Sequence, residues 1–136
     1  MTNQEKKKEL RKYGQIERRL DELIAERQAW IDRATRITPS LSGMPRANGI
    51  SDKIGDAVAQ VDKIDSRIAE VMCSLSCELD RINHVIDSVP DLKLQTLLRY
   101  RYILCMKWED ISDKMHFDLK WLHVLHGRAL EAITPF

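Results

Sequence analysis

A heptad repeat in the middle of the chain is its most restrictive feature. Repeats of seven match two turns of an α-helix and place their side chains on one stripe, which a neighbouring helix must cover. The repeat therefore predicts a long helix that begins near Ser51 or Asp52 and packs along a second helix. Its members are Ile54, Val61, Ile68, Leu75, Ile82 and Val89, with Ala57, Ile64, Val71 and Val85 at the complementary position.

The preceding segment supplies the partner helix. Thr2 or Asn3 can cap its start, and its own heptad is interrupted only by Arg27. The intervening residues 38–51 hold two of the four prolines and two of the five glycines, which is typical of a loop. Two helices of about 35 residues joined by a loop form an antiparallel hairpin about 50 Å long. The first seam contains Tyr13, Ile16, Leu20, Leu23, Trp30, Ala34 and Ile37.

We interpret residues 1–89 as one helical domain that oligomerises, with a homodimer as the expected state. The second helix also carries a stripe of small side chains opposite its seam, which allows two interpretations. The stripe can be a close helix contact, either between copies or with the C-terminal part, or it can be an ordinary weakly polar outer face. Its members are Ala59, Ser66, Ala69, Cys73, Ser76 and Cys77.

Residues 90–136 are predicted to form a second, smaller domain of short helices. Pro90 ends the long helix, and a third helix is expected from about Asp91 to Cys105. A short helix around Ile111 and Met115 follows. After the turn "HFD", apolar residues at three- and four-residue spacing predict a final helix over residues 119–133, with Asp118 as its N-cap. The whole chain is thus expected to be all-α.

The last two helices fit a helix-turn-helix. Such a unit needs a small residue where its helices cross, which Ser112 supplies, and apolar residues beside the turn, which Met115 and Phe117 supply. Glycine usually occupies the turn, whereas this chain has His116, a residue type that tolerates a left-handed backbone better than most.

In a DNA-reading unit of this kind, the start of the last helix enters the major groove. Lysine and histidine there can donate to base acceptors, and arginines on flanking elements can contact phosphates, which fix the register. The base-reading candidates are Leu119, Lys120, Trp121, His123 and Val124. The phosphate candidates are Arg99, Arg101, Lys107 and Arg128.

The net charge of the chain restricts the hypothesis of DNA binding. The formal net charge is +1, so DNA attraction has to come from a local basic surface. The five basic residues Lys6, Lys7, Lys8, Arg11 and Lys12 either touch phosphate or form a solvated helix start. The opposing interpretation of the C-terminal domain is a helical core with a solvated polar face.

The stretches "LLRYRYILCMKWEDISDKM" and "LKWLHVLHGRAL" resemble a known family. They are similar to small transcriptional regulators of phages and prophages of Gram-positive bacteria, the late-gene regulators of the ArpU and RinA kind. The upstream "SDKIGDAVAQVDKI" is also similar to that group. The resemblance implies a helix-turn-helix like region 4 of bacterial sigma factors and a role in regulating phage genes. The chain departs from the pattern at Cys105, Met106 and His116.

Other chemistry has little support in the sequence. His116, His123 and His126 lie close together, and Cys73 and Cys77 are four apart, but neither set matches a metal-site spacing. No motif for catalysis or cofactor binding occurs. The chain has no apolar run long enough to span a membrane and no apolar signal segment, so we expect a cytoplasmic protein with reduced thiols.

Three functional interpretations remain. The first is a sequence-specific regulator of phage genes that binds duplex DNA as an oligomer and can also contact RNA polymerase. The second is a protein-interaction module that binds RNA polymerase or another regulator without reading DNA, which the near-neutral charge favours. The third is a phage DNA-packaging subunit, which predicts a ring in place of a dimer.

Overall fold

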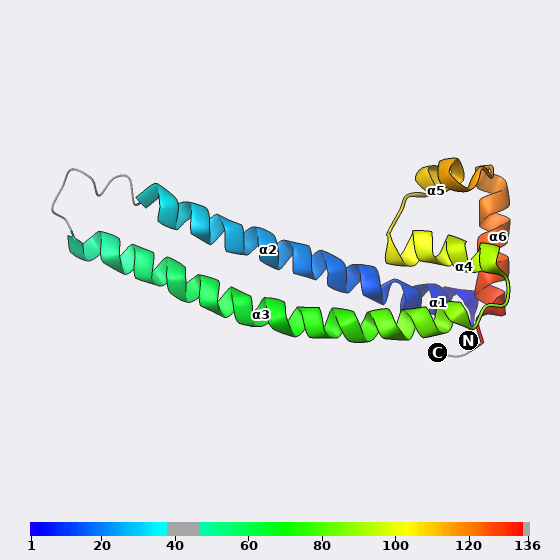
Figure 1. Ribbon diagram of the computed structural model, residues 1–136, viewed down its shortest axis with the longest axis horizontal. Helices are drawn as coiled ribbons and strands as arrows, with labels where there is room; N and C mark the ends of the chain where they lie inside the picture. Colours follow the sequence, from blue (N-terminus) through cyan, green and yellow to red (C-terminus); the bar gives the residue numbers. More distant parts are fainter. Residues whose placement is uncertain (38–46, 135–136) are drawn as a thin grey trace. The chain divides into compact units, whose positions relative to one another are not determined.

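The structure, a computed structural model, describes residues 1–37 and 47–134, and in these ranges every element is a helix. The all-α prediction is confirmed (Figure 1). No helix in the described ranges has both the length and the apolar character needed to cross a membrane. The elements are α1 (Asn3–Leu10), α2 (Lys12–Ile37), α3 (Ala47–Asp87), α4 (Leu92–Leu98), η2 (Arg99–Ile103), α5 (Trp108–Met115) and α6 (Leu119–Ala132).

The chain forms two compact units, and their boundaries differ from the division at residue 89 predicted from the sequence. Unit 1 combines Met1–Glu17 with Leu75–Phe136, and unit 2 is Arg18–Ser74. The difference arises because both ends of the predicted hairpin pack with the C-terminal helices. Leu10 and Tyr13 from the start of the chain share one buried cluster with Ile82 and Val85 of α3 and with residues of α4 and α6.

The chain starts as predicted, but its first helix is interrupted. Thr2 forms a capping box with Glu5, in which each side chain bonds the other residue's backbone N–H. The sequence predicted one helix of about 35 residues from this point. The structure instead ends α1 at Leu10 and begins α2 at Lys12. Leu10 is buried in unit 1, and Leu23 of α2 is buried in unit 2.

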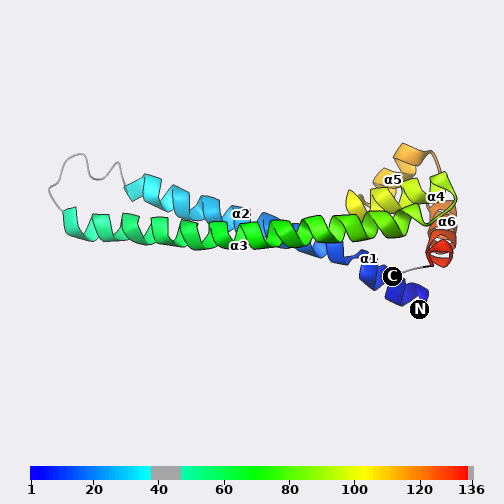
Figure 2. The same cartoon turned by 60° about the horizontal axis from the view of Figure 1, so that its bottom comes forward.

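Unit 2 is a helical hairpin, as the heptads predicted. The parts of α2 and α3 that belong to it run side by side in opposite directions (Figures 1 and 2). Leu23, Ala57 and Ile64 are its buried apolar residues. Arg27, which interrupts the first seam, turns outward and pairs through Nε with Asp65 Oδ1 at 2.6 Å.

Only part of the loop predicted over residues 38–51 falls within the described residues. Residues 38–46 lie outside the described residues, whereas α3 already begins at Ala47, several residues before the predicted start. The six small residues on α3 opposite its seam, from Ala59 to Cys77, are all exposed.

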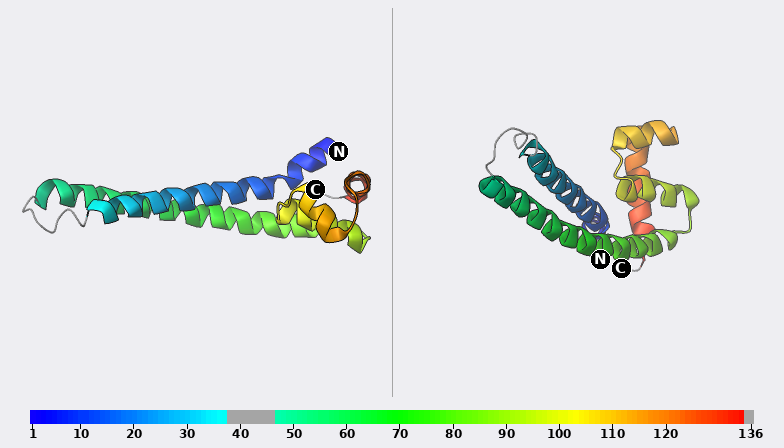
Figure 3. Two further views of the ribbon diagram at one scale, coloured as in Figure 1. Left: turned by 90° about the horizontal axis from the view of Figure 1, so that it is seen from above. Right: turned by 60° about the vertical axis from the view of Figure 1, so that its left-hand side comes forward.

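Unit 1 holds the main core. The end of α3 contributes its seam together with Ile86, which the heptad prediction omitted. The helices α4, α5 and α6 and the π-helical turn η2 close over this surface (Figures 1 and 3). Its buried residues are Leu10, Tyr13, Ile82, Val85, Ile86, Val89, Leu94, Leu97, Leu98, Tyr102, Ile111, Leu122, Leu125, His126, Ala129, Leu130 and Ile133.

The third helix differs from its prediction over residues 91–105. Asp91 caps α4, but the helix widens after Leu98 into the π-helical turn η2, where Leu104 N–H donates to Arg99 O at 3.0 Å. The chain then leaves the helix at Cys105, whose φ is 53°. A Cβ at Gly14 would lie 3.1 Å from Cys105 Sγ, so the glycine makes room for this exit.

Candidate nucleic-acid interface

The predicted arrangement of two helices joined by a short turn is found in α5 and α6. The helix α5 ends at Met115 and is capped by His116, which has φ 59° and ψ 38°, the left-handed conformation for which glycine is the usual residue. Its N–H donates to Ser112 O, and the Ser112 hydroxyl donates to Phe117 O. Met115 and Phe117 pack against the core on either side of this turn. The helices α5 and α6 cross steeply (Figures 1 and 3).

The second helix of the pair is fixed at its start and along one face. Asp118 accepts a hydrogen bond from the Trp121 backbone N–H at 2.7 Å, which confirms it as the N-cap. The helix ends at Ala132, one residue before the predicted end. Leu122, Ala129 and Leu130 are at most 1% exposed, so one face of α6 is anchored in the core of unit 1.

The opposite face of α6 presents the base-reading candidates. Leu119, Trp121 and Val124 are 41%, 38% and 46% exposed, and Lys120 and His123 are exposed as well. All five come from the first two turns, the part of a recognition helix that reaches base edges. Glu131 is exposed on the same face as Lys120 and Val124, nearer the C-terminus, where its carboxylate repels phosphate.

Two aromatic stacks border this exposed face. On one side, the guanidinium of Arg128 lies over the Trp121 ring at 5.1 Å. On the other side, the His123 ring lies 4.8 Å from the Trp108 ring, and Arg101 covers the same indole at 4.6 Å. These contacts hold Trp121, His123 and Arg128 in place before any ligand arrives.

The four phosphate candidates fall into two groups. Lys107 and Arg128 are exposed, and neither forms an ion pair with a described carboxylate. Arg99 instead pairs with Asp87 and donates to Asn83 Oδ1, both on α3. Arg101 donates to Met106 O at 2.9 Å while it covers Trp108. The structure thus gives Arg99 and Arg101 roles inside unit 1, which a phosphate contact would have to share or replace.

His126 has a different place from the one suggested by sequence. The sequence places it near His116 and His123, but in the structure it is 6% exposed and its Nε2 lies 2.6 Å from the Tyr102 hydroxyl. Burial, and then the positive charges of Lys7 and Arg101, lower the pKa of His126 to about 4. Burial also raises the pKa of Tyr102 to about 12. The pair is therefore neutral at pH 7, and the hydroxyl and Nε2 share one hydrogen bond whose direction depends on the imidazole tautomer.

The contribution of α1 to this region was missed by the sequence analysis. Lys6 Nζ donates to Leu130 O of α6 at 2.7 Å, and Leu10 is 1% exposed in the same core. The signal in the sequence was weak, because Leu10 stands alone among charged residues and does not extend the heptad. Trp108 packs against the core, partly buried, between Arg101 and the two rings of His123 and His126.

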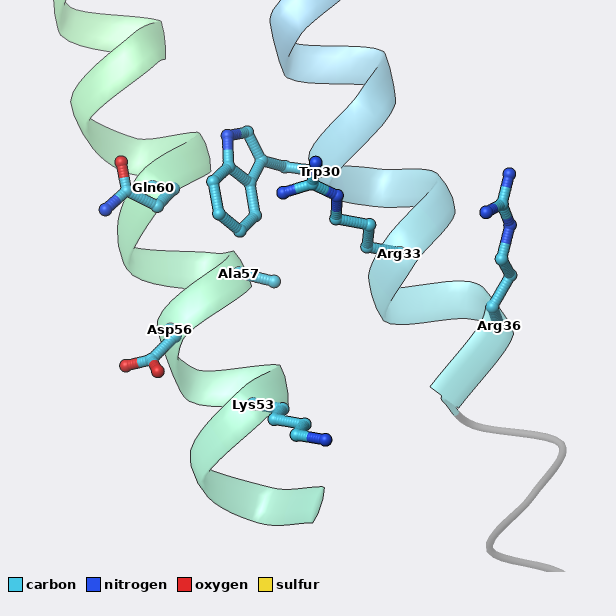
Figure 4. Close-up of a pocket in the computed structure, with 7 residues that line it drawn as sticks. All are labelled: Trp30, Arg33, Arg36, Lys53, Asp56, Ala57 and Gln60. Carbon is cyan, nitrogen blue, oxygen red and sulfur yellow. The ribbon is translucent and has the colours of Figure 1, made fainter. Parts of the chain in front are cut away.

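Unit 2 has a hollow between the C-terminal part of α2 and the N-terminal part of α3. Its volume is about 660 Å³, and Trp30 points from α2 toward Ala57 and Gln60 of α3 (Figure 4). Arg33 stacks on Trp30 at 4.6 Å, while Arg36 and Asp56 point away from the gap. Because the basic side chains do not converge on one point, we assign no ligand to this hollow.

Among the described residues, no three His, Cys, Asp or Glu side chains are grouped so that they could hold a metal ion. Cys73, Cys77 and Cys105 are exposed and form no disulfide. None of the family models, curated proteins or solved structures compared with this chain matches it.

Proposed function

We propose that this protein is a transcriptional regulator that binds duplex DNA through the exposed face of α6. The observation that carries the proposal is the helix pair α5–α6. After the left-handed turn at His116, one face of α6 is buried in the core, and five exposed side chains line the first two turns of the other face. A helix supported in this way can enter the major groove, which is wide enough to admit one.

Within this proposal, Lys120 donates to guanine acceptors and His123 to base acceptors or phosphate. Val124 and Leu119 offer apolar contact to a thymine methyl group. Arg128 and Lys107 contact the phosphate backbone, which gives affinity but no sequence preference. The further assignment to phage or prophage genes rests on the resemblance of "LLRYRYILCMKWEDISDKM" and "LKWLHVLHGRAL" to that group of regulators.

The proposal includes an oligomer, with a homodimer as the simplest form. One short helix reads few base pairs, and two linked copies gain affinity through effective concentration. The apolar side chains Ile24, Val58 and Met72 on unit 2 are 50–56% exposed, which supports the use of this hairpin as the oligomerisation element.

The experiment selects binding sequences from a random duplex library with purified protein at near-physiological salt. We expect an enriched motif, repeated at about one helical turn if two copies bind side by side. Lys120→Ala should reduce discrimination among sequences, whereas Arg128→Ala should weaken binding to all sequences alike and flatten its salt dependence. If both variants retain the wild-type affinity, preference and salt slope, the proposed orientation of α6 in the groove is wrong.

A second candidate function is favoured by the apolar character of the same face. Leu119, Trp121 and Val124 together expose apolar surface where a DNA-reading helix usually carries polar groups. Such a face suits a protein partner, for example RNA polymerase or another regulator. If the library stays random and the protein also fails to bind duplex DNA at low salt, this interaction function replaces the first.

A further inference from the structure

We infer that α1 provides a second phosphate-binding surface beside α6, formed by Lys7 and Arg11 together with Arg101. The inference rests on the proposed DNA binding and deepens it, because it extends the interface from one helix to two. From the sequence alone, the basic start of the chain fits either a phosphate contact or a solvated helix start. The structure places it beside the candidate interface.

The first step is the position of α1. Lys6 Nζ donates to Leu130 O, and Leu10, one helical turn further on, is buried against the core that contains Leu130. Lys6 and Leu10 therefore form the face of α1 that meets unit 1. Figures 1 and 2 show α1 beside the C-terminal part of α6.

The second step is the direction of the remaining basic side chains. Lys7 and Arg11 are four residues apart, so they share the strip next to the inward face of α1. Both lie near enough to His126 that their charges lower its pKa, as does the charge of Arg101. Arg101 in turn covers Trp108, whose ring contacts His123 on the exposed face of α6. The cations thus continue from α1 to the base-reading helix.

The carboxylates of α1 already have hydrogen-bond or ion-pair partners. Glu5 belongs to the capping box with Thr2, and Glu9 pairs with Lys12 at 2.8 Å and with Arg81 at 3.3 Å. Lys7 and Arg11 form no ion pair with any carboxylate in residues 1–37 and 47–134. Their charges remain available to an external anion such as a phosphate of duplex DNA.

The chain offers a control pair of equal charge at the next positions along the chain, Lys8 in α1 and Lys12 at the start of α2. Glu9 keeps its ion pair with Arg81 when Lys12 is replaced. Lys7→Gln/Arg11→Gln and Lys8→Gln/Lys12→Gln each remove two positive charges, but the second pair lies on a different strip. Glutamine has a helix propensity close to that of lysine and arginine, so both variants should keep α1 folded. Circular dichroism and the urea midpoint check this point.

The experiment measures affinity for a labelled 30-base-pair mixed-sequence duplex by fluorescence anisotropy over a range of salt concentrations. A plot of log affinity against log salt has a slope of about 0.9 per phosphate contacted, so the Lys7/Arg11 variant should lose about 1.8 from that slope. The Lys8/Lys12 variant should retain the wild-type slope. The inference is overturned if both variants lose slope equally or if neither does.

Two further measurements distinguish a failure of this inference from a failure of the proposed DNA binding. If the wild-type protein does not bind the duplex even at about 50 mM salt, the proposed DNA binding fails and the inference fails with it. Proton NMR of His126 tests the placement of α1 without DNA. The pKa of His126 should rise in the Lys7/Arg11 variant and stay constant in the Lys8/Lys12 variant. An unchanged pKa in both would contradict the proposed strip.

Discussion

The two units of this protein pack the same kind of helix in different ways. Unit 1 buries a contiguous cluster that draws on the first helix, the end of α3 and all the C-terminal helices. Unit 2 buries only Leu23, Ala57 and Ile64 among its described apolar side chains, and it leaves a hollow beside Trp30. The helix α3 belongs to both units. Its two halves therefore experience different packing within one continuous backbone.

The comparison shows that a regular heptad does not by itself provide a core. The seam of α3 continues through both units, but two helices enclose far less apolar surface than several helices that surround a common centre. The free energy of unfolding should accordingly be higher for unit 1, and unit 2 should open locally at lower cost. The following predictions test this difference, beginning with the largest expected effect.

The strongest test removes the same side chain from each unit. Leu122 in α6 and Leu23 in α2 are both 0% exposed, so Leu122→Ala and Leu23→Ala delete identical buried groups. We expect Leu122→Ala to lower the free energy of unfolding by about 2–5 kcal/mol, because the crowded core cannot fully collapse around the cavity. Leu23→Ala should cost less, since the two helices of the hairpin can move together. Urea denaturation measures both values.

Hydrogen exchange along α3 measures which part of this helix each substitution destabilises. In the wild-type protein, amides near Ile82 and Ile86 should exchange more slowly than those near Ala57 and Ile64. Leu23→Ala should accelerate exchange only in the first half of α3. Equal acceleration of both halves by either variant would mean that the chain unfolds as a single cooperative unit, and the comparison would be wrong.

A second prediction uses the fact that all four histidines lie in unit 1. The pKa of His126 is about 4 in the folded protein, against 6.5 for an unperturbed histidine, so the unfolded chain takes up a proton first as the pH falls. Stability is therefore lost between about pH 6.5 and pH 4. The pKa difference corresponds to a total of roughly 3 kcal/mol.

His126→Gln isolates this contribution. Glutamine can still accept from the Tyr102 hydroxyl but does not titrate in this range. Urea midpoints between pH 7 and pH 5 should fall more steeply for the wild-type protein than for the variant. Parallel curves would show that His126 does not limit the stability of unit 1 in acid.

The smallest expected effect concerns the turn of the helix pair. His116 has φ 59°, a conformation that costs most residues with a Cβ roughly 1–2 kcal/mol relative to glycine. His116→Gly should raise the free energy of unfolding by about 0.5–1 kcal/mol, because the greater freedom of glycine in the unfolded chain offsets part of the gain. His116→Ala is the matched control and should give no increase. A glycine variant less stable than the alanine variant would contradict the left-handed assignment.

Sequence reasoning succeeded where a local rule applied. The capping signals at Thr2 and Asp118, the seam of α3 and the left-handed turn at His116 all depend on residues within a few positions of one another. The exposure of the base-reading candidates also followed from the period of α6. Their contact with DNA stays a prediction, because exposure does not identify a ligand.

What sequence reasoning missed depends on contacts between distant segments. The break at Arg11, the packing of Leu10 beneath α6 and the burial of His126 all arise because the start of the chain joins unit 1. The partners of Arg99 on α3 were hidden for the same reason, since Asn83 and Asp87 are more than ten residues away. The spacing of apolar residues within one segment does not predict its contacts with a distant segment.

The π-helical turn at Arg99–Ile103 gives the chain one residue more than an α-helical path through this segment needs. A π-helical turn of this kind accommodates one inserted residue within a helix. Deleting one residue here would restore the ordinary α-helical hydrogen bonds and rotate every following side chain by about 100° around the axis of that helix. Tyr102 would then leave its place beside His126, and Arg101 its place over Trp108. The alignment of the exposed face of α6 with the core is therefore set by the number of residues between Leu98 and Trp108 as well as by their identities.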